Sequence, residues 1–284
     1  EDLRMRDPFI SVDREHDCYY IITSRWSEGR GGLFALRSRD LKNWEETGYV
    51  YKAPTDYLGT NDWWAPDTYF YKGAWYTFVT VRNEARGILR GTTILRSTVL
   101  PPERLNMTPE GVQSLDASLF VAEDGTPWMV FSVEWNGPNV RNMTGEVWVQ
   151  QLRSDLTDTV GEPHRLFQAT EASWVKPVPG GGYVTDAPFI WRDEKSGNLI
   201  LLWSSFSPRY SIGQAISKSG SVLGPWEHES EPVFADDGGH QMIFRDLRGK
   251  LHIAFHAPNG PSGRECVIIR KIKIRNGKFV PLKN

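Results

Sequence analysis

The chain has 284 residues and a mass of 32.4 kDa, which is enough to bury a hydrophobic core without disulfides or metal ions. Hydrophobic residues make up 39% and charged residues 24% of the chain, and these fractions exclude disordered and fibrous proteins. The 33 Lys and Arg residues nearly balance the 35 Asp and Glu residues, with no basic block and no apolar run of the ~20 residues that span a bilayer. Nucleic-acid and membrane partners are therefore not expected.

Cysteine, glycine, proline and aromatic residues narrow the fold class. Cys18 and Cys266 are the only cysteines, so a disulfide scaffold and a thiolate metal site are excluded. The 26 Gly and 18 Pro residues interrupt every apolar pattern before it continues for more than about two helical turns. With 12 Trp, 10 Tyr and 13 Phe residues, this composition is typical of many short strands joined by turns.

Five segments repeat one pattern in chain order. Each has a polar residue, a short apolar strand, a turn with Gly or Asp, and a second strand rich in aromatic or aliphatic residues. The segments are residues 7–22, 67–78, 116–131, 186–203 and 240–255, and their first residues are Asp7, Asp67, Asp116, Asp186 and His240. A period of roughly 50–70 residues made of strand-turn-strand units is typical of propeller blades.

We therefore predict an all-β fold, a five-bladed β-propeller in a single domain over residues 1–284. A two-sheet sandwich would also contain many short strands, but it would not explain five corresponding polar residues at similar spacing. If the first strand of each segment is the innermost strand of a blade, the five polar residues converge at one mouth of the central channel. The repeat thereby predicts a site as well as a fold.

Short fragments around these polar residues resemble one enzyme family. They are Arg6-Asp7-Pro8, Trp64-Ala65-Pro66-Asp67, Leu115-Asp116-Ala117-Ser118, Thr185-Asp186-Ala187-Pro188 and Gly238-Gly239-His240. In their order and spacing the sequence resembles glycoside hydrolase family 43, whose five-bladed propellers act on polysaccharides that contain arabinose and xylose. The resemblance implies that Asp7 is a general base and that Asp116 orients the general acid and raises its pKa. The general acid is then expected in the fourth blade.

These roles agree with the chemistry of glycoside hydrolysis. Hydrolysis with inversion requires one ionised carboxylate to activate water and one protonated carboxyl to protonate the leaving oxygen, about 6.5–9.5 Å apart. A third carboxylate nearby keeps the acid protonated near neutral pH, because like charges disfavour ionisation. A propeller mouth would hold all three on rigid strand ends.

The sequence departs from the family at the acid. Family members usually carry Glu-Gly-Pro there, whereas this chain has Asp186-Ala187-Pro188, with a side chain one methylene shorter. Three interpretations remain open. Asp186 is the acid with the substrate seated deeper, or Glu134 in Ser132-Val133-Glu134-Trp135 reaches the substrate, or catalysis is impaired and the pocket only binds sugar.

Five residues are candidates for substrate binding: Trp63, Trp64, Asp67, Trp135 and Arg209. Indole rings stack on the apolar faces of sugars. Because adjacent strand residues point to opposite faces, at most one of Trp63 and Trp64 is expected to face the pocket.

Three histidines need separate interpretations. The resemblance implies that His240 faces the active site and helps to hold a hydrated calcium or another ion in the channel, and a buried, hydrogen-bonded histidine is the alternative. No cofactor is required for the reaction, and a calcium ion near His240 would be structural. His252 and His256 lie four residues apart on one strand face without a third ligand, so we expect structural roles for both.

The sequence therefore predicts an inverting, exo-acting glycosidase of plant-type polysaccharide. Its preferred substrate is terminal α-L-arabinofuranose, with β-D-xylose or β-D-galactose behind it. The alternative is a catalytically impaired propeller that binds carbohydrate. We expect an oligosaccharide or polysaccharide partner and a monomer. The compartment is unknown from the sequence. Secretion or export to the periplasm is favoured, since a removed signal peptide is compatible with a sequence that begins at Glu1.

Overall fold

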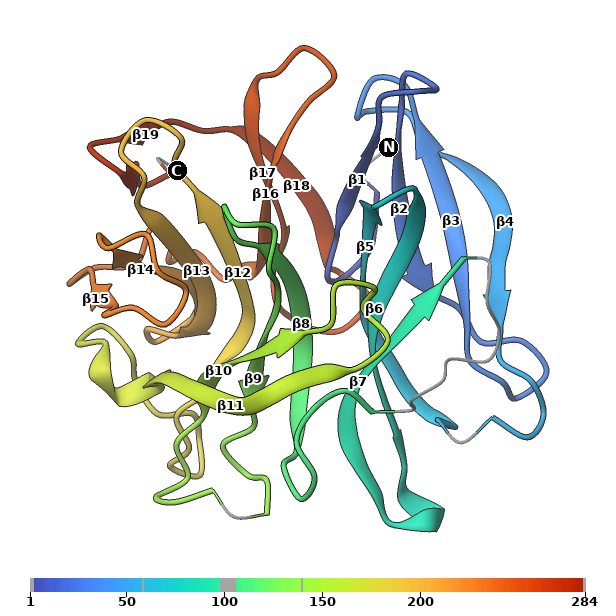
Figure 1. The fold of residues 1–284 in the computed structure, drawn as a ribbon, viewed down its shortest axis with the longest axis horizontal. Coiled ribbons are helices and arrows are strands. Elements are labelled where there is room, and N and C mark those ends of the chain that lie inside the picture. The colour runs from blue at the N-terminus through green and yellow to red at the C-terminus, as the bar shows by residue number, and fades with distance from the viewer. Residues whose placement is uncertain (1–2, 58, 98–105, 139, 283–284) are drawn as a thin grey trace.

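Five antiparallel sheets form a ring in the computed structural model, which describes residues 3–57, 59–97, 106–138 and 140–282 (Figure 1). Blade one contains β1 (Ile10–Asp13), β2 (Cys18–Ser24), β3 (Gly32–Ser38) and β4 (Glu45–Lys52). Blade two contains β5 (Asn61–Tyr71), β6 (Ala74–Asn83) and β7 (Ile88–Arg96). Blade three contains β8 (Ser114–Val121), β9 (Pro127–Val133), β10 (Glu146–Leu152) and β11 (Thr159–Gln168). The predicted all-β propeller with five blades is confirmed.

The remaining two blades complete the ring. Blade four contains β12 (Asp186–Arg192), β13 (Leu199–Phe206), β14 (Tyr210–Ser217) and β15 (Glu227–His228). Blade five contains β16 (Gly239–Arg245), β17 (Leu251–Ala257) and β18 (Cys266–Lys271), and a short hairpin of β19 (Ile274–Arg275) and β20 (Lys278–Phe279) follows it. The two helical segments described, η1 (Glu84–Arg86) and η2 (Ala169–Glu171), are single 3-10 turns, so none of the described helices could span a membrane.

The hydrophobic core lies between neighbouring blades. Each blade is covered on both faces, which is why runs such as residues 199–203 are apolar throughout instead of alternating. The large side chains packed between blades three and four include Phe167, Trp174 and Trp203. Because every blade packs on two others, the ring holds the first strand of each blade in a fixed place around the axis.

The N-terminal segment closes the ring. The amide of Met5 donates to the carbonyl of Glu265 at 2.9 Å, and the amide of Val267 donates to the carbonyl of Leu3 at 2.9 Å. Residues 3–5 therefore lie beside β18 as an additional strand at the edge of blade five. Of the two free cysteines, Cys266 lies in β18 beside this segment, whereas Cys18 is buried in blade one.

One buried histidine predicts acid sensitivity of the fold. His228 packs edge-on against Phe167 at 4.5 Å between ring centroids, and both of its ring nitrogens are buried without a hydrogen-bond partner. Burial lowers the pKa of His228, although Glu171 acts in the opposite direction. The unfolded chain binds this proton with an ordinary pKa near 6.5, so stability decreases as the pH falls below about 6.5.

We therefore expect His228→Phe to reduce the loss of melting temperature between pH 7 and pH 5 by about 2–4 °C. Differential scanning fluorimetry of this variant beside His164→Phe, which replaces an exposed histidine of β11, would measure it. Equal pH dependence in wild type and both variants would contradict the prediction.

Candidate active site

In or just before the innermost strand of every blade lies a residue with left-handed backbone conformation. These residues are Asp7, Ala65, Asp116, Ala187 and His240, with φ between 43° and 54°. In blades two to five the residue lies in a β-bulge, where the strand loses register with its neighbour. Such strained positions occur in proteins where a side chain must be aimed, often at functional sites.

This alignment corrects the equivalence inferred from sequence. Asp7, Asp116 and His240 do occupy the left-handed position, but Asp186 precedes it by one residue and Asp67 follows it by two. The sequence pattern aligns the five polar residues with one another. The feature that the blades share in the structure is instead the left-handed residue, so Asp67 and Asp186 are not equivalent in position to the other three.

Carboxyl groups from three blades meet around His240. The Nδ1 atom of His240 lies 3.2 Å from Oδ1 of Asp7 and 3.4 Å from Oδ2 of Asp116. Side-chain atoms of Asp116, Asp186 and His240 all lie within 4.8 Å of one another. The structure thus brings together the three residues predicted as base, orienting carboxylate and acid, with the predicted channel histidine between them.

Asp7 is held in the ionised form. Burial by itself raises the pKa of Asp7, but the nearby His240, His256 and Arg6 side chains together lower it more, so that the pKa lies below the ordinary range. The side chain remains 22% exposed, and its carboxylate can therefore reach solvent. An ionised carboxylate open to water has the properties of a general base.

Asp186 is held in the protonated form. Burial and the negative charge of Asp116 raise the pKa of Asp186 well above its ordinary value. The hydroxyl of Tyr210 donates to Oδ2 of Asp186 at 2.5 Å, whereas Oδ1 is buried and has no donor beside it. The pKa of Asp116 is also raised, to about 7, chiefly by burial. The hydrogen bond between these neighbouring carboxyl groups raises the pKa of Asp186 and lowers that of Asp116, as expected when Asp186 carries the proton between them.

Asp67 lies inside the channel and not at a sugar-binding surface. It lines a small cavity on the axis with Asp116 and His240, which has room for about one water molecule. The hydroxyl of Tyr69 donates to Oδ2 of Asp67 at 3.1 Å, and burial raises the pKa of Asp67 to about 7. The predicted role in substrate binding is therefore corrected to a buried carboxyl in the channel.

Glu134, the alternative acid, is bound to an arginine. It follows β9, and both of its carboxylate oxygens lie 2.6 Å from Nη1 of Arg90, which also donates to Asp62 at 2.7 Å. Burial raises the pKa of Glu134, but the ion pair with Arg90 acts against protonation. Glu134 is close enough for its charge to act on Asp116, so it belongs to the site, but as a paired carboxylate.

The two adjacent tryptophans differ in burial as expected, although the strand is irregular here and Trp63 has a left-handed backbone with φ 59°. Trp63 is 0% exposed and stacks on Tyr51 between blades one and two, so its predicted contact with sugar is wrong. Trp64 is 42% exposed, and the guanidinium carbon of Arg90 lies 4.2 Å from its ring centroid. Trp64 is therefore the one of the pair that can present a ring to a ligand.

The other two predicted binding residues lie in loops at the mouth. Trp135 is half-buried and packs on Gly182, where an added Cβ would lie 2.2 Å from the indole. Arg209, between β13 and β14, is exposed and forms an ion pair with Asp236 at 3.0 Å. Neither residue contacts the carboxyl cluster among the described interactions.

Two site residues were not predicted as such. His256 was expected to be structural, but its Nδ1 accepts a hydrogen bond from the amide of Asp7 at 3.2 Å, and its Nε2 lies 3.2 Å from Oδ1 of Asn259. Tyr210 was not among the predicted site residues. The sequence signal for both is weak, because alternation along a strand does not identify which neighbour a side chain meets.

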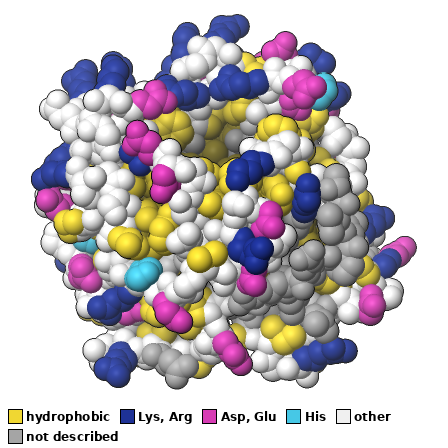
Figure 2. Space-filling view, viewed as in Figure 1, with side chains coloured by type: hydrophobic (Ala, Val, Ile, Leu, Met, Phe, Trp, Pro, Cys, Tyr) yellow, Lys and Arg dark blue, Asp and Glu magenta, His cyan; other side chains and the backbone are white. Residues whose placement is uncertain are grey.

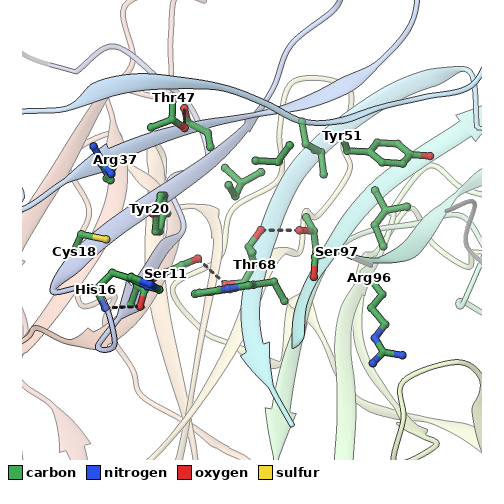
Figure 3. A pocket seen from close by; sticks show the side chains of 18 of the residues that line it. Ser11, His16, Cys18, Tyr20, Arg37, Thr47, Tyr51, Thr68, Arg96 and Ser97 are labelled. Atoms are coloured by element: carbon green, nitrogen blue, oxygen red, sulfur yellow. Dashed lines mark hydrogen bonds and ion pairs between the residues drawn. The ribbon is translucent and has the colours of Figure 1, made fainter. Parts of the chain in front are cut away.

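A larger cavity than the one on the axis lies elsewhere. It has a volume of about 690 Å³ between blades one and two, and Figure 3 shows Tyr20, Arg37 and Thr68 among the side chains around it. Its lining contains a single carboxyl, that of Asp13, which is paired with His16 at 2.9 Å. Hydrolysis with two carboxyl groups is therefore not expected there.

The outer surface agrees with a propeller that has an open mouth. In the space-filling view one face is hollowed near its middle, with hydrophobic side chains deep in the hollow and Lys and Arg side chains near its rim (Figure 2). Acidic and basic side chains are mixed over the rest of this face. No large surface of one charge is visible in this view.

Comparison with known proteins agrees with a carboxyl-based hydrolytic site. The family model described as glycosyl hydrolases family 43 matches residues 2–279. The chain is similar to the crystal structure of endo-arabinase from Bacteroides thetaiotaomicron VPI-5482, with 43% identity and a TM-score of 0.89 over 98% of this chain and 97% of that one.

Two curated relatives are more distant. The extracellular endo-alpha-(1->5)-L-arabinanase 1 of Bacillus subtilis (strain 168) is 26% identical over 83% of this chain and 71% of its own length. The xylan 1,3-beta-xylosidase of a Vibrio species is 25% identical over 80% of this chain. The match spans only 42% of the length of that Vibrio relative.

Proposed function

The chain belongs to glycosyl hydrolase family 43, and we propose that it is a glycosidase that hydrolyses arabinose-containing polysaccharide with inversion. The observation that carries the proposal is the opposite protonation of two carboxyl groups in one site. Asp7 is kept ionised by His240, while Asp186 is kept protonated by burial and by Asp116. Separated pKa values of this kind assign base and acid.

In this mechanism each proton has a defined path. Asp7 takes a proton from a water molecule, whose oxygen attacks the anomeric carbon on the face opposite the leaving group. Asp186 gives its proton to the glycosidic oxygen as the carbon–oxygen bond breaks and the bonding electrons pass to that oxygen. The imidazole of His240, between Asp7 and Asp116, holds both carboxylates in place.

The substrate part of the proposal rests on the relatives. The solved structure at 43% identity is titled an endo-arabinase, and a curated relative is named an endo-arabinanase. A further curated relative from Cellvibrio japonicus, 21% identical, is named an exo-alpha-(1->5)-L-arabinofuranosidase. We therefore propose α-L-arabinofuranosyl linkages as the preferred substrate, ahead of xylosyl or galactosyl linkages. Analysis of the early products distinguishes exo from endo action.

The test is a substrate panel. Wild type is assayed on p-nitrophenyl α-L-arabinofuranoside, β-D-xyloside and β-D-galactoside, and on linear arabinan. We expect arabinan to be the best substrate. Arabinose as the sole early product would show the exo action expected from sequence, and a range of early oligosaccharides would show endo action. No hydrolysis of any substrate would overturn the proposal.

The same panel tests the second candidate function, a propeller that binds carbohydrate without turnover. The observation that favours it is the shorter acid, Asp186, with both of its oxygens near buried protein atoms. In that case arabino-oligosaccharides would raise the melting temperature while no product forms.

We also propose that a divalent cation such as calcium stabilises the channel near His240. The donor set fits in kind, because Asp67 and Asp116 are carboxyl groups that line one small cavity with His240, and oxygen ligands suit calcium. A bound cation would favour the ionised form of both carboxyl groups, whose pKa values burial raises. Adding calcium to protein treated with EDTA should raise the melting temperature by about 3–6 °C.

Asp67→Asn is the matched variant for this prediction, since it removes one charge from the channel. We expect it to lose the response to calcium. Equal melting temperatures of wild type in EDTA and in calcium would contradict a cation at this site.

Finally, we propose that the protein acts outside the cytoplasm, in the medium or the periplasm. Relatives from Bacillus subtilis and Cellvibrio japonicus are both named extracellular. The monomeric state expected from the sequence stays a prediction.

A further inference from the structure

Tyr210 joins the two halves of the site. It is the first residue of β14 and is 2% exposed, and its hydroxyl donates to Oδ2 of Asp186 at 2.5 Å. Its ring lies parallel to the imidazole of His256, with 5.9 Å between centroids and 16° between planes. His256 in turn accepts the amide proton of Asp7. Asp186 and Asp7 are thus connected through one buried aromatic side chain.

The neighbouring backbone leaves room for this ring. Gly239 immediately precedes His240 in β16, and a Cβ at Gly239 would lie 2.2 Å from Cε1 of Tyr210. The amide of Gly238 donates to the carbonyl of Tyr210 at 3.0 Å. The ring is therefore enclosed by blade five, and its hydroxyl has little freedom to leave Asp186.

The hydrogen bond distinguishes the two oxygens of Asp186. Oδ2 accepts from Tyr210, and Oδ1 is buried with no donor beside it. The hydroxyl of Tyr210 therefore restrains the orientation of this carboxyl group.

We propose that Tyr210 is a positioning residue for the acid: its hydroxyl holds Oδ2 of Asp186 and so fixes the orientation in which this carboxyl group gives its proton to the leaving oxygen. This inference rests on the proposed function. As the proton moves from Asp186 to the glycosidic oxygen, Asp186 becomes a carboxylate, and the hydrogen bond from Tyr210 to Oδ2 becomes charge-assisted and stronger. The hydroxyl thus favours the state formed during proton transfer.

Tyr210→Phe isolates this role, because it keeps the ring on His256 and removes only the hydroxyl. The groups that face Asp186 are Asp116 from β8, His240 from β16, Glu134 after β9 and Tyr210 itself. Of these, Tyr210 provides the hydrogen bond that the variant removes, while the other three side chains stay in place.

The experiment compares Tyr210→Phe with Tyr57→Phe, which removes a buried hydroxyl bonded to Thr93 at 3.3 Å outside the site. On an arabino-oligosaccharide, whose leaving group needs an acid, we expect kcat of Tyr210→Phe to fall about 10–100-fold with little change in KM. On p-nitrophenyl α-L-arabinofuranoside, whose leaving group needs little acid, the fall should be under about 3-fold. Tyr57→Phe should match wild type on both.

Gly239→Ala is a second variant. It displaces the ring of Tyr210, and with it the hydroxyl, without removing the hydroxyl group. It should show the same dependence on leaving group. Equal losses on both substrates, or a Tyr210→Phe enzyme that matches wild type, would overturn the positioning role while leaving the proposed function intact. A wild type that hydrolyses nothing would overturn the proposed function, and the role of Tyr210 with it.

Discussion

Asp7→Asn should reduce kcat about 10²–10⁴-fold on every hydrolysed substrate, the range typical of a positioned general base. An amide at this position cannot accept the proton of the attacking water, whatever the leaving group. The backbone is already held by the amide bond to His256, so substrate affinity should change little. Steady-state kinetics and a separate binding measurement would check both parts.

Asp13→Asn is the matched control, because Asp13 lies at the end of β1, the strand that follows Asp7, and pairs with His16 outside the site. It should keep full activity. Added azide, a small nucleophile that needs no base, should restore part of the Asp7→Asn activity on p-nitrophenyl α-L-arabinofuranoside. Unchanged hydrolysis in Asp7→Asn would remove Asp7 from the mechanism.

Asp186→Asn should lose much more activity on substrates with a poor leaving group than on substrates with a good one. We expect a loss of about 10²–10⁴-fold on an arabino-oligosaccharide and under about 10-fold on the p-nitrophenyl glycoside. The alkaline limb of kcat/KM should also disappear. Wild type loses activity as the pH rises through the raised pKa of Asp186, because the acid then gives up its proton. The acid limb belongs to Asp7 and lies below the ordinary aspartate pKa of about 3.9.

Glu134→Gln is the decisive comparison for the acid. Because Glu134 is paired with Arg90, we expect its loss to disturb Arg90 and Trp64 and to raise KM more than it lowers kcat. A leaving-group dependence in Glu134→Gln that is absent in Asp186→Asn would transfer the acid role to Glu134.

The sequence by itself determined the number of blades and the strands that carry the site. Five repeats of polar residue, strand, turn and strand are readable because each blade forms from consecutive residues, so that its periodicity is local. The same repeat placed Asp7, Asp116, Asp186 and His240 near one another, since all lie at the start of a first strand. The different burial of Trp63 and Trp64 was also expected from the period of a strand.

Only the tertiary structure decided which of these residues touch and how they are protonated. Alternation along a strand states that neighbours face opposite sides, but not that Trp63 enters the core and Trp64 the surface. Asp116 lies in the bulge of its strand, whereas Asp67 follows the bulge of its own strand by two residues. This bulge is a backbone feature without a residue signature, since Ala, Asp and His all occupy it. Tyr210, His256 and Arg90 act through contacts between blades, whose partners are distant in the chain. Such contacts, together with burial, set the charges of the carboxyl groups, and neither can be read from a single stretch of sequence.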